Sequence, residues 1–166
     1  MQEGIKRKGL LPRVKFLLLA VLLLASCDTT VYHRFEQVDG AVWSTSDTLS
    51  FLYEGTRFVP DGSAMEMALQ VRYNADYAYK NLCMRVETWK AGDSVALSVD
   101  TLCCSIFDDN GRRLGSTAGT IYQNGSDERP LAASFADTLH LKVSHIMSSD
   151  LKGVLDIGVK FDAVKQ

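Results

Sequence analysis

The sequence lacks the residue patterns of several common catalytic and metal sites. None of its four cysteines stand in a C-x-x-C spacing, so a zinc site or a thioredoxin-like redox pair has no support. No G-x-S-x-G elbow frames a nucleophilic serine. Histidines are few: His33, His140 and His145. On a strand, His140 and His145 would face opposite sides about 17 Å apart. We therefore predict three surface imidazoles, no metal, no cofactor and no enzymatic activity.

Asp108-Asp109-Asn110-Gly111 is the one carboxylate-rich string that could suggest calcium. A calcium loop needs oxygen ligands at alternate positions, whereas Arg112 and Arg113 follow here and bring positive charge. We interpret the string as a turn.

A membrane-spanning apolar run and a basic surface are also missing. The unbroken apolar run from Phe16 to Ala25 is shorter than the roughly 20 residues that cross a bilayer as a helix. The net charge is −2, and residues 1–26 carry five of the 18 basic and one of the 20 acidic residues. The remainder has 13 basic against 19 acidic residues, a net charge of −6. This excludes nucleic acid and disfavours anionic lipid headgroups as partners.

The short apolar run has the surroundings of an export signal. Basic residues precede it, and Leu24-Ala25-Ser26-Cys27 follows in a string that resembles a bacterial lipobox. In a lipobox the cysteine is acylated and becomes the first mature residue. A buried core helix ending in cysteine is the alternative, but the flanking charge and the polar Asp28-Thr29-Thr30 argue against it. We predict a signal peptide over 1–26, a lipid bilayer as partner through acylated Cys27, and a polar tether completing 27–40.

Residues 41–166 show the period-two alternation of half-buried strands. The clearest stretches are 65–73, 82–87, 95–99, 139–144 and 155–162, and the weaker ones are 48–53, 102–107, 120–122 and 131–135. Turn residues separate them, and only Met147 to Gly153 has helical character. The pattern predicts a single all-β domain, an antiparallel β-sandwich of immunoglobulin-like or jelly-roll-like type. Cys83 could form a disulfide with Cys103 or Cys104. We favour the alternative that at least two of these three cysteines are free thiols packed in the core as small hydrophobic residues.

Several strings, taken in order after the lipobox, resemble the gliding motility lipoprotein family GldH of Bacteroidetes. They are Trp43 with Asp47–Phe51, Val71–Asn74 with Tyr77–Leu82, Asp100–Leu102, Asp108–Gly115, Ile146-Met147, Leu151–Val154 and Asp156–Val159. Two positions depart from the family: Ala78 replaces a frequent proline, and Arg113 replaces a frequent aromatic residue. The resemblance implies an accessory component of the gliding machinery, which is tied to type IX secretion, and it supplies no catalytic residues. Relatives that do not glide also carry such proteins.

The resemblance also bears on location. Surface-exposed lipoproteins of the Bacteroidetes often carry a run of acidic or lysine residues directly after the acylated cysteine. Here Asp28 stands alone. We therefore favour a lipid-anchored position in the cell envelope that faces the periplasm, with envelope proteins of the gliding or secretion machinery as partners.

Aromatic residues beside short polar groups form the candidate binding patch, since such rings suit sugar stacking or a protein hot spot. Its members are Tyr73, Asn74, Tyr77, Tyr79, Asn81 and Trp89. Two interpretations stay open besides a partner site: a tyrosine-lined loop packed on the sandwich edge, and a glycan-binding lipoprotein that stacks sugars on Tyr77, Tyr79 and Trp89. Trp43 is expected in the core.

Aspartate followed by serine or threonine and an apolar residue recurs four times, which is similar to the O-glycosylation sequon of exported Bacteroidetes proteins. The candidate acceptors are Thr48, Ser94, Thr101 and Thr138. The same pattern arises where an aspartate ends a turn and a β-branched residue starts a strand.

Overall fold

The structure is a computed structural model that describes residues 29–57, 59, 60 and 62–165, so the predicted signal peptide and Cys27 lie outside the described residues. The strands are β1 (Thr30–Gln37), β2 (Val42–Trp43), β3 (Leu49–Tyr53), β4 (Ser63–Tyr73), β5 (Asn81–Lys90), β6 (Ser98–Ser105), β7 (Ser116–Ala118), β8 (Ile121–Gly125), β9 (Arg129–Leu131), β10 (Leu139–His145), β11 (Leu151–Lys152) and β12 (Val154–Lys165). A 3₁₀ turn, η1 (Asp39–Ala41), lies between β1 and β2. Within the described ranges no helix is long and apolar enough to cross a bilayer.

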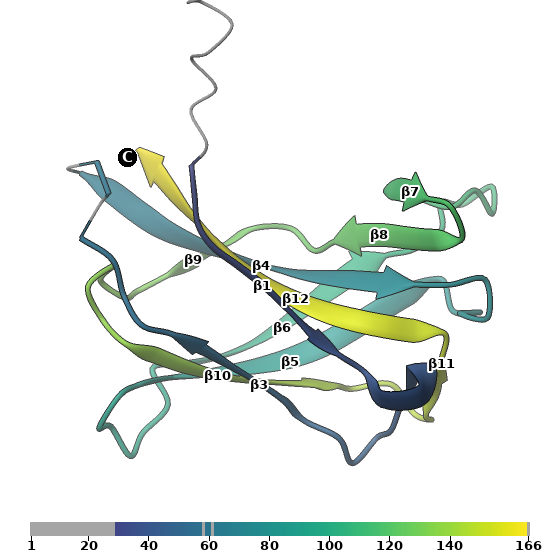
Figure 1. The fold of residues 1–166 in the computed structure, drawn as a ribbon, viewed down its shortest axis with the longest axis horizontal. Helices are drawn as coiled ribbons and strands as arrows, with labels where there is room; N and C mark the ends of the chain where they lie inside the picture. The colour runs from purple at the N-terminus through teal and green to yellow at the C-terminus, as the bar shows by residue number, and fades with distance from the viewer. Residues whose placement is uncertain (1–28, 58, 61, 166) are drawn as a thin grey trace, which may run out of the picture.

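Two antiparallel sheets pack face to face (Figure 1). The larger sheet has the order β1-β12-β4-β8-β7, with β9 paired to one end of β4. The smaller sheet has the order β3-β10-β5-β6, and β2 pairs with β11 at one end of the molecule. The predicted all-β antiparallel sandwich is confirmed.

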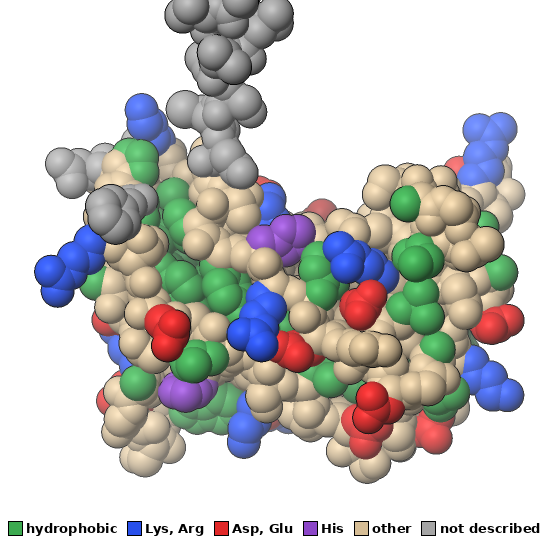
Figure 2. Space-filling view, in the orientation of Figure 1, with side chains coloured by type: hydrophobic (Ala, Val, Ile, Leu, Met, Phe, Trp, Pro, Cys, Tyr) green, Lys and Arg blue, Asp and Glu red, His purple; other side chains and the backbone are tan. Residues whose placement is uncertain are grey.

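The core lies between the sheets because each central strand turns every second residue inward. On β4 the inward residues are Met65, Met67, Leu69, Val71 and Tyr73, each at most 2% exposed. Leu82, Met84 and Val86 of β5 meet them from the other sheet. Trp43 is fully buried, as expected. Acidic and basic side chains are interspersed over the face drawn in Figure 2, in keeping with the absence of a basic patch from the sequence.

Residues 30–37 are not a tether, as the sequence analysis expected, but the edge strand β1. This strand pairs with β12 over its whole length, from Thr30 opposite Asp162 to Gln37 opposite Asp156. The Tyr32 ring packs inward, with its centroid 5.5 Å from that of Tyr53 and 5.3 Å from that of Phe161. The folded domain therefore begins at Thr30, eleven residues earlier than predicted.

Two other sequence predictions were wrong in detail. Residues 147–153 form no helix; they contain the short strand β11. Val95 and Val99 were expected to share the inner face of a strand, yet they are 76% and 52% exposed. Strand β6 starts only at Ser98. Its even-numbered residues Leu102 and Cys104 point inward, whereas Val99 points outward.

Cys83 and Cys103 lie directly opposite each other on β5 and β6 and form a disulfide, with Cα atoms 4.0 Å apart. Cys104 is a free thiol that is fully buried on the inner side of β6. Only one of the three cysteines is thus a core hydrophobe, because adjacent residues of a strand face opposite sides and Cys103 points outward.

We expect reduction of this disulfide to lower the free energy of unfolding by about 3 kcal/mol, the loop-entropy value for a crosslink of its span. The two cysteines are separated by 20 residues, and Cys103 is exposed to a reductant. Urea unfolding with and without dithiothreitol measures the change, and the Cys83→Ala/Cys103→Ala variant should match the reduced protein. An unchanged urea midpoint would contradict the prediction.

Candidate functional site

The predicted tyrosine patch lies at one end of the sandwich, where β4 ends and β5 begins. We call this region the tyrosine end; it comprises the 74–80 connection, the 107–115 loop, the start of β8 and the 146–153 segment. Tyr73 is opposite Tyr122 in the β4–β8 ladder, and their rings stack with centroids 5.4 Å apart. Tyr77 joins this cluster from the connection, 5.7 Å from Tyr73 and 5.8 Å from Tyr79.

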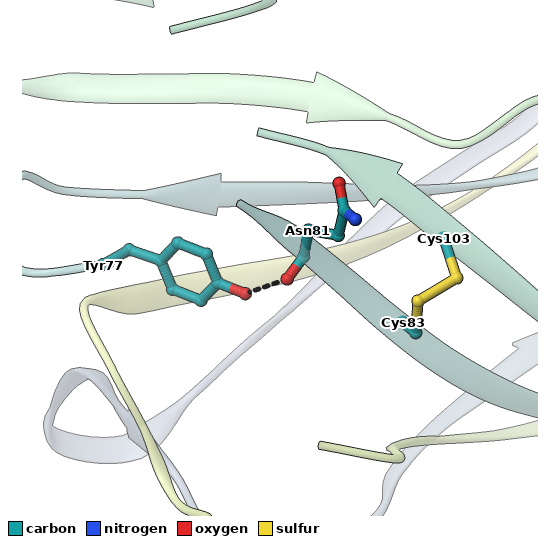
Figure 3. Close-up of a disulfide and its surroundings, with 4 residues drawn as sticks. All are labelled: Tyr77, Asn81, Cys83 and Cys103. Atoms are coloured by element: carbon teal, nitrogen blue, oxygen red, sulfur yellow. Dashed lines mark hydrogen bonds between the residues drawn. A yellow bond between two sulfur atoms is a disulfide. The ribbon is translucent and has the colours of Figure 1, made fainter. Parts of the chain in front are cut away.

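Tyr73 and Tyr77 belong to the core and not to a binding surface, which corrects the sequence prediction. Their side chains are 0% and 1% exposed. The Tyr77 hydroxyl donates a 2.9 Å hydrogen bond to the backbone oxygen of Asn81, as Figure 3 shows beside the Cys83–Cys103 disulfide. Burial raises the pKa of both phenols, because the ionised form would lose its hydration.

Asn74 has a structural role in shaping the connection. Its Oδ1 accepts the Asp76 backbone N–H at 2.9 Å, and its own N–H donates to the Gly153 oxygen at 2.9 Å. Gly153 has φ of +83°, and a Cβ there would lie 2.6 Å from Asn74 Oδ1. The glycine thereby allows the 146–153 segment to approach the tyrosine-bearing connection closely.

Tyr79 is the ring of the patch that reaches solvent, with 39% of its surface exposed. Its hydroxyl lies 2.8 Å from Ser149 Oγ, which fixes the ring against the neighbouring segment. Asn81 is exposed at the start of β5. The ammonium group of Lys80 pairs with Asp109 at 2.6 Å and lowers the pKa of that carboxyl group. Tyr79 therefore combines an accessible ring with a defined orientation.

Arg113 is the member of this end that the sequence analysis did not assign to it. Its guanidinium carbon lies 4.4 Å from the Tyr122 ring centroid and 4.7 Å from that of Phe107, within cation–π range. One Nη donates to the Ala75 oxygen at 3.4 Å. The signal was the departure already noted, a cation at a position where the family resemblance implied an aromatic residue; here that cation packs among aromatic rings.

Trp89 does not join the patch. It is half-buried near the far end of β5, with the Lys142 ammonium 5.4 Å from its ring. Tyr79 precedes β5 and Trp89 nearly ends it, so ten residues of extended chain, about 33 Å, separate them. With Tyr77 buried as well, the three rings cannot form the glycan-stacking platform that the sequence suggested.

Exposed apolar side chains gather at the tyrosine end. Of the eight large exposed hydrophobic residues in the described part of the chain, Tyr79, Leu114, Ile121 and Ile146 lie here, and a fifth, Val42, is opposite Lys152 of the 146–153 segment. Connections place them: Ile146 N–H donates to the Cys83 oxygen at 3.0 Å, and Leu114 N–H to the Ile106 oxygen at 2.9 Å. Apolar groups exposed near rigid aromatic rings are typical of a surface that another protein covers.

The histidines are only partly as expected. His33 and His140 are exposed, but His145 is 6% exposed and buried at the tyrosine end. Its Nε2 lies 3.2 Å from the Trp43 backbone oxygen, and its ring packs edge-on against the indole. The surface imidazole predicted for His145 is thus wrong. Among the described residues, no cluster of histidine, cysteine, aspartate or glutamate has the geometry to hold a metal ion.

Comparison with known proteins decides the family. The GldH lipoprotein family matches residues 30–161, from the first residue of β1 into β12. The chain belongs to the GldH lipoprotein family. Membership makes it a gliding-motility-associated lipoprotein and implies a membrane-anchored place in the cell envelope. The match begins where β1 begins, so the GldH domain includes the strand that sequence analysis placed in a tether.

No curated protein matches this GldH family member. Solved structures similar to it include Eiger TNF from S. frugiperda, at 8% identity and a TM-score of 0.33 over 84% of this chain and 96% of that one. Latent PorU from Porphyromonas gingivalis matches at 10% identity and a TM-score of 0.33, over 83% of this chain and 13% of that one. These TM-scores are too low to support an argument about function.

The four candidate glycosylation sites of the GldH domain differ in access. Thr48 and Ser94 are exposed in loops, Thr101 is exposed within β6, and Thr138 is half-buried. At Thr138 the preceding Asp137 has the turn-ending role, since it accepts the Ser134 N–H at 2.8 Å.

If the protein is O-glycosylated, we expect the sugar on Thr48 or Ser94 and none on Thr138, because a transferase must reach the hydroxyl. Mass spectrometry of peptides from the native envelope tests this. Unmodified residues at all four positions would remove the hypothesis, and a modified Thr138 alone would contradict the accessibility argument.

Proposed function

We propose that this protein is a non-enzymatic accessory component of the envelope machinery for gliding motility and type IX secretion. In this proposal Cys27 is acylated, the domain faces the periplasm, and the protein acts by contact with envelope proteins. The match to the GldH lipoprotein family over residues 30–161 carries the proposal. The lipobox-like string before Cys27 supports the anchor.

The tyrosine end is the surface that we assign to the protein partner. Tyr79 offers a ring held by Ser149, and Ile146 is 53% exposed close by in the chain that leads to Ser149. A tyrosine ordered before binding loses little conformational entropy when a partner covers it, which favours affinity. The half-buried Arg113 adds rigidity to the same end, since its guanidinium lies close to the Phe107 and Tyr122 rings.

Site-specific photocrosslinking in native cells tests this assignment. A photoreactive phenylalanine analogue replaces Tyr79 in one strain and Val95, which is 76% exposed at the other end of β5, in the control strain. We expect crosslinks from position 79 to a motility or secretion component and none from position 95. Crosslinks from position 95 alone, or only to proteins outside this machinery, would overturn the assignment.

A matched variant pair measures the function itself. Ile146→Asp introduces a charge among the exposed apolar residues of the tyrosine end. Val95→Asp introduces the same charge at an exposed position at the opposite end of the sandwich. Both positions are exposed, so we expect stability changes within about 0.5 kcal/mol for each. Loss of gliding or of type IX secretion in Ile146→Asp alone supports the partner surface; equal phenotypes would contradict it.

A further inference from the structure

The start of β1 is firmly attached to the rest of the domain. The Thr30 hydroxyl donates to Asp162 Oδ1 at 2.7 Å, and the Lys160 ammonium binds the other oxygen of that carboxylate at 2.6 Å. Asp162 is only 4% exposed. One residue earlier, the Thr29 backbone oxygen accepts the Ala163 N–H at 2.8 Å. Because buried charged hydrogen bonds are costly to break, the chain is part of the sheet from Thr29 onward.

This attachment sets a limit on the distance between the domain and Cys27. Cys27 lies three positions before Thr30, and even a fully extended chain of three residues spans only about 10 Å. A tether over 27–40 would have allowed more than 40 Å. Strand β12 continues past the partner of Thr30 to Lys165, which pairs with Ser63 of β4. These three strand ends therefore lie together, at the upper left of Figure 1.

The tyrosine end lies at the opposite end of the long axis. Strand β4 runs from Ser63 beside the end of β12 to Tyr73 in the tyrosine cluster. Its 11 residues span about 35 Å. In Figure 1, β11 and the end of β4 lie at the right, away from the start of β1.

From these positions we infer that the bilayer surface lies against the end formed by Thr30, Ser63 and Lys165, and that the tyrosine end points away from the membrane. The inference rests on the proposed acylation of Cys27 and adds to it the orientation of the domain relative to the bilayer. The anchor holds one end of the sandwich at the headgroups, while the exposed apolar residues of the other end stand about 35 Å out. A protein partner is thereby met in the aqueous compartment, beyond the lipid surface.

Fluorescence quenching in vesicles tests this orientation with the full acylated protein. A dye is attached to Lys165→Cys or to Arg112→Cys; both positions are exposed, at the anchored and the tyrosine end respectively. The vesicles contain phosphatidylethanolamine, phosphatidylcholine and a lipid with a nitroxide on its headgroup. Cys104 should remain unlabelled, because burial raises its pKa to about 12 and shields it from the reagent.

We expect quenching at position 165 to be at least fivefold stronger than at position 112. Equal quenching would mean that the domain lies flat, and absence of quenching at both positions would mean that it stands clear of the lipid; either result overturns the orientation. A 12-residue glycine–serine insertion between Asp28 and Thr29 adds a coil of about 19 Å and should reduce the difference between the labels. An unchanged difference would show that the short connection is not its cause.

Vesicle flotation separates this inference from the anchor itself. The acylated protein should float with the vesicles and Cys27→Ser should not. If the wild-type protein and Cys27→Ser both stay in the soluble fraction, the proposed acylation is wrong and the inferred orientation is wrong as well. If only the wild-type protein floats while the two labels are quenched equally, the anchor stands and the orientation alone is wrong.

Discussion

Replacing Gly153 by alanine should lower the free energy of unfolding by about 2–5 kcal/mol. Gly153 has φ of +83°, a conformation that costs an L residue about 1–2 kcal/mol. The added Cβ would also lie 2.5 Å from the Tyr77 backbone nitrogen and 2.9 Å from the Asp76 carbonyl carbon. These are backbone atoms that cannot rotate away, so overpacking adds about 1–3 kcal/mol. Urea unfolding followed by tryptophan fluorescence measures the loss.

Gly111→Ala is the matched control. Gly111 has φ of +76°, yet an added Cβ meets nothing within 4 Å. It should therefore show the conformational cost of about 1–2 kcal/mol without the clash. The difference between the two variants isolates the close approach of residue 153 to the tyrosine-bearing connection. Equal losses would show that the connection moves aside freely.

The same substitution links stability to the proposed function. Gly153 touches the connection that carries Tyr79, whereas Gly111 lies in the 107–115 loop. We therefore expect Gly153→Ala to weaken photocrosslinking from position 79 even at temperatures where the domain remains folded. Gly111→Ala should leave these crosslinks unchanged.

The central strands could be predicted from sequence because burial on one face leaves a clear period of two. Met65 to Tyr73 and Leu139 to Val143 show it, and both segments are strands. Each has partners on both sides, so every inward residue is covered and must be apolar. The hydrophobic pattern and the burial then agree.

Edge strands gave weaker signals for the same physical reason. Strand β1 has a neighbour on one side only, and its residues are all half-buried or exposed. A register shift between Thr30 and Tyr32 interrupts the pairing and the alternation further. The polar string therefore suggested a tether. The valines at 95 and 99 also misled: Val95 lies before β6, and Val99 points outward from β6, an edge strand of the smaller sheet.

Sequence analysis grouped Tyr73, Tyr77 and Tyr79, whose rings do lie together, but it did not distinguish the buried rings from the exposed one. Tyrosine packs in a core when its hydroxyl finds a partner, and the partner of Tyr77 is a backbone oxygen that every residue type provides. Composition thus cannot distinguish the buried Tyr77 from the exposed Tyr79 two residues later. The separation between Tyr79 and Trp89, in contrast, follows from the strand that sequence analysis placed over 82–87, because a strand holds its two ends apart.

Raising the pH above 9 should destabilise the domain, by about 3 kcal/mol between pH 7 and pH 11 from the Cys104 thiol alone and by more once the buried phenols titrate. Burial raises the pKa of the Cys104 thiol from 9.0 to about 12, and it raises the pKa of Tyr73 and Tyr77 above their ordinary value of 10.0. These groups stay protonated in the native state while the unfolded chain releases its protons. The unfolded state then binds fewer protons, so stability falls as pH rises.

The expected profile has two slopes. From pH 9 to 10 only Cys104 contributes, at no more than about 1.4 kcal/mol per pH unit. Above pH 10 the phenols join: Tyr73 and Tyr77, and also Tyr32 and Tyr53, whose pKa burial raises as well, so the slope steepens. Because a typical domain is stable by only about 5–15 kcal/mol, a domain at the low end of that range should unfold near or above pH 11. Urea midpoints measured at half-unit intervals from pH 7 to pH 11 give the curve.

Two variants assign the slopes to their groups. Cys104→Ala should remove the decline between pH 9 and 10 and leave the steeper region above it. Tyr77→Phe loses the hydrogen bond to Asn81, about 1 kcal/mol at pH 7, but should decline less steeply above pH 10 because one phenol no longer titrates. The wild-type and Tyr77→Phe curves should therefore converge with rising pH. Parallel curves, or a Cys104→Ala profile that still declines from pH 9, would show that the buried groups at this end do not govern the alkaline transition.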